Sequence, residues 1–123
     1  METIFGIGVD QVEAERVIKS CEKDTFLKKY YTDKECDIIE IRKTRCATNF
    51  AAKEAVVKAL GTGFGQVLPK EVEILRNELG APYVCLHGAA KAYAKEHGIT
   101  KIHLSLTDTK QDAVAYAIAI CER

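Results

Sequence analysis

The segment 49–63, NFAAKEAVVKALGTG, carries three charged side chains ahead of a glycine-rich turn: Lys53, Glu54 and Lys58. On an α-helix Glu54 and Lys58 lie one turn apart on the same face, and Lys53 lies beside them. A carboxylate between two cations, next to a loop rich in accessible backbone, suits a metal-assisted phosphate site. The same spacing is found in a solvated ion pair followed by a helix-capping glycine, and spacing alone favours this second interpretation.

A second carboxylate, Asp10, follows the apolar segment 4–9, which predicts a short buried strand that ends at Asp10. An aspartate ahead of a helix is often only an N-cap. If this strand packs against the helix, Asp10 and Glu54 together with waters and phosphate oxygens would satisfy Mg²⁺, which prefers octahedral oxygen ligation. Neither carboxylate makes a metal site alone.

Other motifs exclude several classes of site. Residues 6–10 read G-x-G-x-D and lack the later glycine of a dinucleotide fingerprint. The Gly-Thr-Gly turn at 61–63 follows a helix, whereas a P-loop precedes one. Ser105 is expected at the end of a strand, where it would meet a ligand or simply form a turn. No Gly-x-Ser-x-Gly elbow surrounds it, so a nucleophilic serine lacks support.

The composition indicates one small domain over residues 1–123. The chain is 47% apolar, and its formal net charge of zero gives no sign of nucleic-acid binding. The five scattered cysteines show no metal or disulfide spacing and are expected to be reduced thiols. No signal peptide and no apolar run of about 20 residues is present, so we expect a cytoplasmic protein without a membrane segment.

The elements that would position these residues mix helices and strands, which predicts an α+β domain. Thr32 and Glu35 form a capping-box pattern that opens a helix through about residue 41. Gly61 is expected to end the helix that carries Glu54. The predicted helices cover about 12–20, 32–41, 44–60 and 87–98, and the predicted strands cover 4–9, 71–75, 82–86, 102–106 and a buried final strand at 113–121.

Four segments occur in one order along the chain: GIGVDQVEAER, FAAKEAVVKALGTG, NELGAPYV and IHLSLTDTKQDAVA. Together they resemble holo-acyl-carrier-protein synthase, the short, trimeric branch of the phosphopantetheinyl transferases. The resemblance spans essentially the whole chain, and the second segment is the most specific. It implies a compact α+β fold, an antiparallel sheet packed against a long central helix, that assembles as a homotrimer.

The resemblance implies a magnesium-dependent transfer of 4′-phosphopantetheine from coenzyme A to a serine of apo acyl carrier protein, with release of 3′,5′-ADP. Asp10 and Glu54 match the family's Mg²⁺ ligands, and Lys58 matches its phosphate-facing lysine. Mg²⁺ and lysine would stabilise charge on the pyrophosphate oxygens while the serine oxygen is held in line with the β-phosphorus. Glu54, directly or through a water, is the candidate for accepting the serine proton.

The remaining matched residues concern binding. Gly61, Thr62 and Gly63 match the loop near the coenzyme A phosphates, and Lys58 faces the same phosphates. Ser105 falls in the family's nucleotide-side strand. Arg16 matches the arginine that meets the acidic recognition helix of the carrier protein.

The chain departs from the family pattern at two positions. Asn49 stands where relatives often carry arginine, so one cationic phosphate contact is missing, and Arg45 one turn earlier is a possible replacement. Asp108 stands where many relatives carry histidine, and an anion there would repel phosphate unless it faces a donor.

Two other classes of function stay open at this stage. One is a binding module that senses coenzyme A or 3′,5′-ADP and has lost the transferase activity. The departures from the family pattern at Asn49 and Asp108 suggest it. The other is a structural oligomer without a ligand, for which the alanine-rich strand 113–121 would be the interface.

Overall fold

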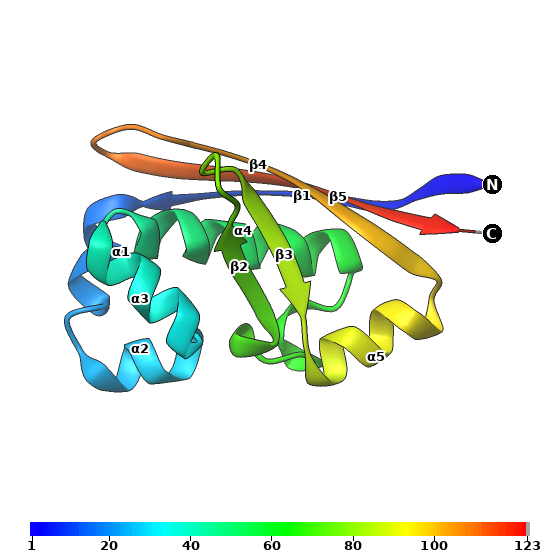
Figure 1. Ribbon diagram of the computed structural model, residues 1–123, viewed down its shortest axis with the longest axis horizontal. Coiled ribbons are helices and arrows are strands. Elements are labelled where there is room, and N and C mark those ends of the chain that lie inside the picture. Colours follow the sequence, from blue (N-terminus) through cyan, green and yellow to red (C-terminus); the bar gives the residue numbers. More distant parts are fainter. Residues whose placement is uncertain (123) are drawn as a thin grey trace.

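The structure, a computed structural model, describes residues 1–122. It has two layers, a three-stranded antiparallel sheet and the helices beneath it, as Figure 1 shows. A separate antiparallel hairpin lies across the helical side. The sheet has the order β1-β5-β4, and the strands are β1 (Glu2–Glu13), β2 (Val72–Arg76), β3 (Pro82–Leu86), β4 (Ile99–Asp108) and β5 (Asp112–Glu122).

Five α-helices and two short 3₁₀ turns complete the described part of the chain. Helix α2 is the one helix that the sequence patterns did not predict. The helices are α1 (Ala14–Ser20), α2 (Asp24–Tyr30), α3 (Asp33–Ile41), α4 (Arg45–Leu60) and α5 (Gly88–Glu96), and the 3₁₀ turns cover Gly63–Gly65 and Pro69–Glu71.

Strand β1 packs directly against the backbone of α4. A Cβ atom on Gly8 would lie 2.0 Å from the carbonyl oxygen of Ala55, and one on Gly6 would lie 2.1 Å from that of Ala59. No side chain fits between strand and helix at these points, so the two glycines serve close approach, not dinucleotide binding. This contact brings Asp10, two residues beyond Gly8 on the same face of β1, to the surface of α4.

Strand β1 is longer than the sequence predicts. Its pairing with β5 continues from Asp10, opposite Ala115, as far as Glu13, opposite Asp112. The N-cap of α1 is Glu13, whose side chain makes no capping bond. The interpretation of Asp10 as a strand-ending N-cap is therefore wrong, because pairing with β5 holds the chain extended past it.

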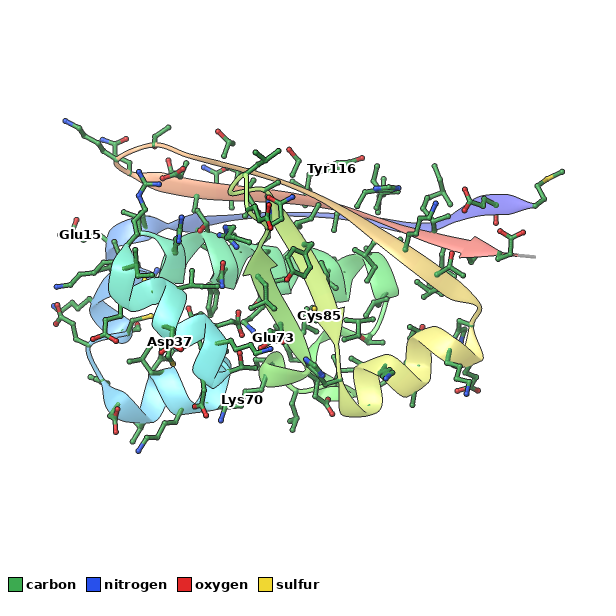
Figure 2. The ribbon with its side chains drawn as sticks, in the orientation of Figure 1. Glu15, Asp37, Lys70, Glu73, Cys85 and Tyr116 are labelled. Atoms are coloured by element: carbon green, nitrogen blue, oxygen red, sulfur yellow. The ribbon has the colours of Figure 1, made fainter. Side chains whose placement is uncertain are left out.

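Strand β5 is buried on one face only, which corrects the prediction of a fully buried strand. Its inward residues are alanines and Cys121, while Tyr116 on the outer face is 41% exposed. The neighbouring strand adds exposed Ile7 and Val9 to this outer face. Figure 2 shows Tyr116 on the side of the sheet that points away from the helices. A single chain thus leaves an apolar sheet face uncovered.

Several local predictions are confirmed. Thr32 and Glu35 form the expected capping box at the start of α3. Helix α4 ends at Gly61, whose φ of 80° is the left-handed conformation that glycine adopts readily. The predicted hairpin is present as β2 and β3. The α+β class with an antiparallel sheet is also confirmed.

Candidate active site

Asp10, Glu54 and Lys58 meet where β1 crosses α4. Lys58 Nζ donates to Asp10 Oδ1 at 3.1 Å and to the carbonyl oxygen of Val9 at 3.0 Å. The Asp10 side chain is 16% exposed and that of Lys58 is 53% exposed. Glu54 is one turn before Lys58 on the same face of α4. The structure therefore brings together the three residues that the sequence singled out for chemistry.

The electrostatics of this group favour an added cation. Burial raises the pKa of Glu54, the Asp10 carboxylate raises it further, and Lys58 opposes both effects. Two carboxylates close enough to repel each other are stabilised by any positive charge placed between them. Lys58 supplies one such charge, and its half-exposed ammonium leaves the site open to solvent.

The donor set fits Mg²⁺ as far as the chain's own residues go. Within residues 1–122 no group of three or more histidine, cysteine, aspartate or glutamate residues is arranged to hold a metal ion. Magnesium sites, however, commonly use one or two carboxylates, with waters and substrate phosphates as the other ligands. Asp10 and Glu54 would provide the two carboxylates of such a site.

The loop after α4 presents backbone in an unusual conformation. Gly61 and Gly63 have φ values of 80° and 59°. Between them, the hydroxyl oxygen of Thr62 is buried and has no hydrogen-bond partner among residues 1–122. The loop begins three residues after Lys58, and the N–H groups of Gly61 and Thr62 donate to the last carbonyl oxygens of α4, those of Val57 and Lys58. Those two N–H groups therefore close the helix and do not point to a ligand.

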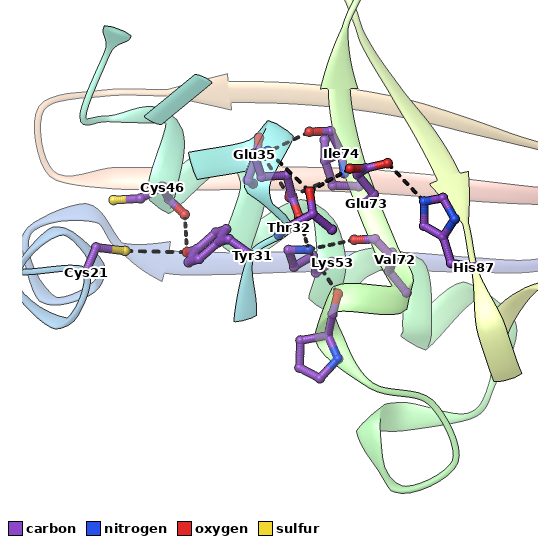
Figure 3. A network of polar contacts seen from close by, with 12 residues as sticks. Cys21, Tyr31, Thr32, Glu35, Cys46, Lys53, Val72, Glu73, Ile74 and His87 are labelled. Atoms are coloured by element: carbon purple, nitrogen blue, oxygen red, sulfur yellow. Dashed lines mark hydrogen bonds and ion pairs between the residues drawn. The ribbon is translucent and has the colours of Figure 1, made fainter. Parts of the chain in front are cut away.

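Lys53 does not belong to this site, although the sequence placed it beside Glu54. Its side chain is 1% exposed and contacts the core on the other side of α4 (Figure 3). The ammonium donates to Glu35 Oε1 at 2.7 Å, to the carbonyl oxygen of Val72 at 2.7 Å and to that of Pro69 at 2.9 Å. The hypothesis of a carboxylate between two phosphate-facing cations is therefore wrong for Lys53.

Asn49 lies in the same buried cluster. Its amide nitrogen donates to Glu35 Oε2 and to the carbonyl oxygen of Ile74, both at 3.0 Å. The residue is fully buried, and its amide oxygen has no partner within the described chain. Asn49 thus supports the core next to α3 and β2 and makes no part of the surface around Asp10.

Glu35 and Lys53 form an ionised pair. Burial raises the pKa of Glu35 and lowers the pKa of Lys53, while each charge opposes the shift of the other. The hydrogen bonds distinguish an ionised pair from a neutral one. Lys53 donates three hydrogen bonds, and only the charged ammonium has three N–H groups. The Glu35 oxygens accept from Lys53, Asn49 and the backbone N–H groups of Thr32 and Ile74, which leaves no acceptor for a carboxyl proton.

Ser105 lies away from Asp10. It is an exposed residue in the interior of β4, not at the end of a strand as the sequence predicts. Its register partner is Tyr116, so it shares the outer face of the sheet, whereas Asp10 faces α4. Within one chain, then, the expected nucleotide-side residue and the carboxylate pair occupy opposite faces of the sheet.

Three arginines and Asp108 line one small cavity that sequence reasoning found only in part. The cavity has a volume of about 180 Å³ and lies between α4, the hairpin and the end of β4. Within residues 1–122 no carboxylate lies within ion-pair distance of these guanidinium groups. Burial lowers the pKa of Arg76, and the charge of Arg45 lowers it further. The arginines are Arg42, Arg45 and Arg76.

An anion would relieve the crowding of positive charge in this arginine cavity. Asp108 also lines this cavity, but within residues 1–122 its carboxylate lies beyond ion-pair distance of the three guanidinium groups, so the donor that would offset its repulsion of phosphate is not in place. Arg45 was recognisable from its position one turn before Asn49, but Arg42 and Arg76 had no local signal. Arg76 comes from β2, and only the packing of the hairpin on α4 brings it to the cavity.

Arg16 is exposed on α1 and borders a separate, larger cavity. This cavity has a volume of about 600 Å³, and Phe26 and Phe50 form part of its wall. Gln11 and Val12, which follow Asp10 on β1, also line it. Arg16 therefore stands beside an open cavity whose wall includes the two residues that follow Asp10 on β1.

The chain belongs to the 4′-phosphopantetheinyl transferase superfamily, whose family model matches residues 6–121. It is 51% identical to a holo-[acyl-carrier-protein] synthase of Lachnoclostridium phytofermentans over 94% of both chains. Among solved structures it is similar to the holo-ACP synthase of Plasmodium yoelii, at 34% identity and a TM-score of 0.85, over 100% of this chain and 99% of that one. The family resemblance drawn from the four sequence segments is thereby confirmed.

A second solved structure carries a ligand. The holo-(acyl-carrier-protein) synthase of Bacillus anthracis, in complex with coenzyme A (3′,5′-ADP), is 30% identical with a TM-score of 0.80, over 97% of this chain and 98% of that one.

In the part of the present chain that the structure describes, no helix has the length and apolar character needed to span a membrane.

Proposed function

We propose that the protein is a holo-acyl-carrier-protein synthase that transfers 4′-phosphopantetheine from coenzyme A to a serine of apo acyl carrier protein, as a single domain over residues 1–123. The observation that carries the proposal is the meeting of Asp10, Glu54 and Lys58 at the crossing of β1 and α4. Strong identity to proteins of that name supports it.

In the proposed reaction the serine oxygen attacks the β-phosphorus of coenzyme A. A new phosphorus–oxygen bond forms, the bond from the β-phosphorus to the bridging oxygen breaks, and 3′,5′-ADP leaves with that oxygen. Glu54 accepts the serine proton, a role that its raised pKa favours. Lys58 neutralises charge that develops on the pyrophosphate oxygens. Asp10 holds Lys58 in place through the 3.1 Å ion pair.

Asp10 and Glu54 would hold the Mg²⁺ ion together with waters and phosphate oxygens. When bound, the ion would supply charge neutralisation at the pyrophosphate. The Gly61, Thr62 and Gly63 loop would contact the coenzyme A phosphates through the Gly63 N–H group and the Thr62 hydroxyl, since the N–H groups of Gly61 and Thr62 already donate to α4.

The nucleotide side of coenzyme A would be completed by a second copy of the chain. Arg45 and Glu54 are about 180° apart around the α4 axis, so one chain cannot present the arginine cavity and the carboxylate pair to the same phosphates. Ser105 is likewise on the opposite face of the sheet from Asp10. In an oligomer, the arginine cavity and Ser105 of one subunit would face the Asp10 site of its neighbour.

The homotrimer that the resemblance implies would cover the outer face of the sheet. Ile7, Val9 and Tyr116 are 58%, 53% and 41% exposed there, and an uncovered sheet face is normally polar. Sedimentation velocity should therefore give three times the monomer mass, and Val9→Lys should shift the protein to monomer. A monomeric wild-type protein would remove the trimer and the shared nucleotide site together.

Arg16 would dock the acidic recognition helix of the carrier protein. Its guanidinium is exposed on α1 beside the larger cavity. Arg16→Glu should raise the KM for the carrier protein about tenfold or more and spare coenzyme A binding. Unchanged carrier kinetics would refute this role.

The test of the function as a whole is a mass-shift assay. Several apo carrier proteins are incubated with the purified protein, coenzyme A and Mg²⁺, and mass spectrometry follows the addition of phosphopantetheine and the release of 3′,5′-ADP. Binding of coenzyme A without any mass shift would support the sensor alternative, and no binding in calorimetry would support the structural oligomer. A metal chelator should abolish the mass shift.

The cytoplasmic location expected from the sequence stays a prediction.

A further inference from the structure

Helix α4 is buried nearly all round, by apolar residues and by polar ones, Asn49 and Lys53 among them. Of its 16 residues 12 are buried. The buried apolar side chains include three larger ones, Val56, Val57 and Leu60, and five alanines, Ala47, Ala51, Ala52, Ala55 and Ala59.

Hydrogen bonds from Tyr31 and Tyr93 reach the two ends of α4, and the contact of Lys53 near its middle has the most partners. Lys53 places its ammonium among three acceptors from three segments: Glu35 of α3, Pro69 at the start of a 3₁₀ turn and Val72 of β2. Asn49, one turn earlier on the same face, donates to the other Glu35 oxygen. Any rotation of α4 breaks several of these hydrogen bonds at once and leaves a buried charge without its partners.

We propose that the Glu35–Lys53 pair, with Asn49, is a positioning device that sets the rotation of α4 and thereby aims Glu54 and Lys58 at Asp10. Lys53 is adjacent to Glu54 in the helix, so the anchored side chain and the chemical one are about 100° apart on a rigid backbone. The close contacts of Gly6 and Gly8 set the distance between β1 and α4. The polar pair sets the angle.

The geometry makes small rotations costly. A carboxylate about 6 Å from a helix axis moves about 1 Å for each rotation of about 10°. A misplacement of about 1 Å in a site can lower the rate about 100-fold. None of the three proposed positioning residues would touch substrate, since all are buried on the side of α4 away from Asp10. This inference rests on the proposed function for its kinetic readout but not for its structural one.

The test uses the double variant Glu35→Gln/Lys53→Met, which removes both charges while keeping side-chain volume. The matched control is Glu73→Gln, which alters a buried carboxylate of the same polar layer that bonds to Thr32 and His87 and not to α4 (Figure 3). Urea unfolding selects conditions in which both variants are folded. Kinetics with a saturating carrier protein then separate kcat from the KM for coenzyme A.

We expect the double variant to lose kcat about tenfold or more while the control stays within about twofold of wild type. A crystal structure of the double variant should show α4 rotated and the 3.1 Å contact between Lys58 Nζ and Asp10 Oδ1 lost. Retention of that contact and of kcat in the folded double variant would overturn the proposal. Equal losses in the control at the same stability would overturn it too.

Asn49→Ala covers the case in which the double variant does not fold. It removes one hydrogen bond to Glu35 and leaves the ion pair, and we expect a smaller fall in kcat, about threefold, with the KM for coenzyme A little changed. A stability loss without any change of kcat would reduce the cluster to a structural role. If wild-type protein shows no transfer, the proposed function fails, and the Lys58–Asp10 contact in the variant structures still decides the positioning role.

Discussion

Two lysines five positions apart on α4 have opposite environments. Lys53 is 1% exposed and bonds to one carboxylate and two backbone carbonyls in the core. Lys58 is 53% exposed and pairs with Asp10 at the surface. They point about 140° apart around the helix, so one faces α3 and the hairpin while the other faces β1. One short motif thus places one lysine in the core and another at the surface beside Asp10.

The difference follows from what surrounds each ammonium. A fully buried cation persists only when every N–H group has an acceptor. All three N–H groups of Lys53 are used by core acceptors, so none is left for a ligand. Lys58 makes two bonds and keeps part of its ammonium in solvent. Lys58, unlike Lys53, therefore keeps donor capacity for a ligand, which the phosphate-binding role proposed for it requires.

Lys53→Met should have the largest effect, because it leaves the Glu35 carboxylate buried without its cation. We expect the free energy of unfolding to fall by about 3–5 kcal/mol, measured by urea denaturation. Lys58→Met is the control and should change it by no more than about 1 kcal/mol, since its ion pair is exposed. Similar losses for the two variants would erase the distinction between the two lysines.

Glu54→Gln should lower the transfer rate about 100-fold or more and leave the protein folded. The raised pKa of Glu54 also predicts how the stability of the protein changes with pH. Because the folded pKa lies above the ordinary value of 4.5, the protein loses stability as the pH rises from there through the folded pKa. The variant should therefore match wild type near pH 4 and be equally or more stable at pH 7 without metal. A variant with full activity would remove Glu54 from the chemistry.

Gly8→Ala tests the β1 side of α4. Its Cβ would lie 2.0 Å from the carbonyl oxygen of Ala55, so the strand must move away from the helix. We expect a stability loss of about 1–3 kcal/mol in thermal unfolding, together with a lower kcat because Asp10 moves with the strand. Gly65→Ala is the control, since nothing lies within 4 Å of the added atom. Unchanged kcat would show that the site tolerates a shift of β1.

Arg45→Ala and Arg76→Ala should have the smallest effect. Each should weaken coenzyme A binding about tenfold, or about 1.4 kcal/mol, in titration calorimetry. The loss should shrink at high salt, because the contact is electrostatic. Lys91→Ala, an exposed lysine on α5 that does not line the cavity, is the control. Equal affinities in all variants would leave the arginine cavity without a part in nucleotide binding.

Local sequence determined much of the fold and the type of chemistry. The capping box at Thr32, the helix end at Gly61 and the hairpin of β2 and β3 each depend on residues within one or two turns of chain, so their patterns are legible in the sequence. Asp10, Glu54 and Lys58 were recognisable because a carboxylate pair and a lysine suit phosphate transfer, and because the ordered family segments contain them.

Tertiary structure alone decided how each polar residue is used. Nothing near Lys53 in sequence distinguishes it from Lys58; the carboxylate of α3, 18 positions away, makes the difference. The arginine cavity likewise needs β2 beside α4, and the outward direction of Ser105 follows from the pairing of β4 with β5. The role of a charged side chain depends on its desolvation and its partners, and both are set by contacts between segments distant in the sequence.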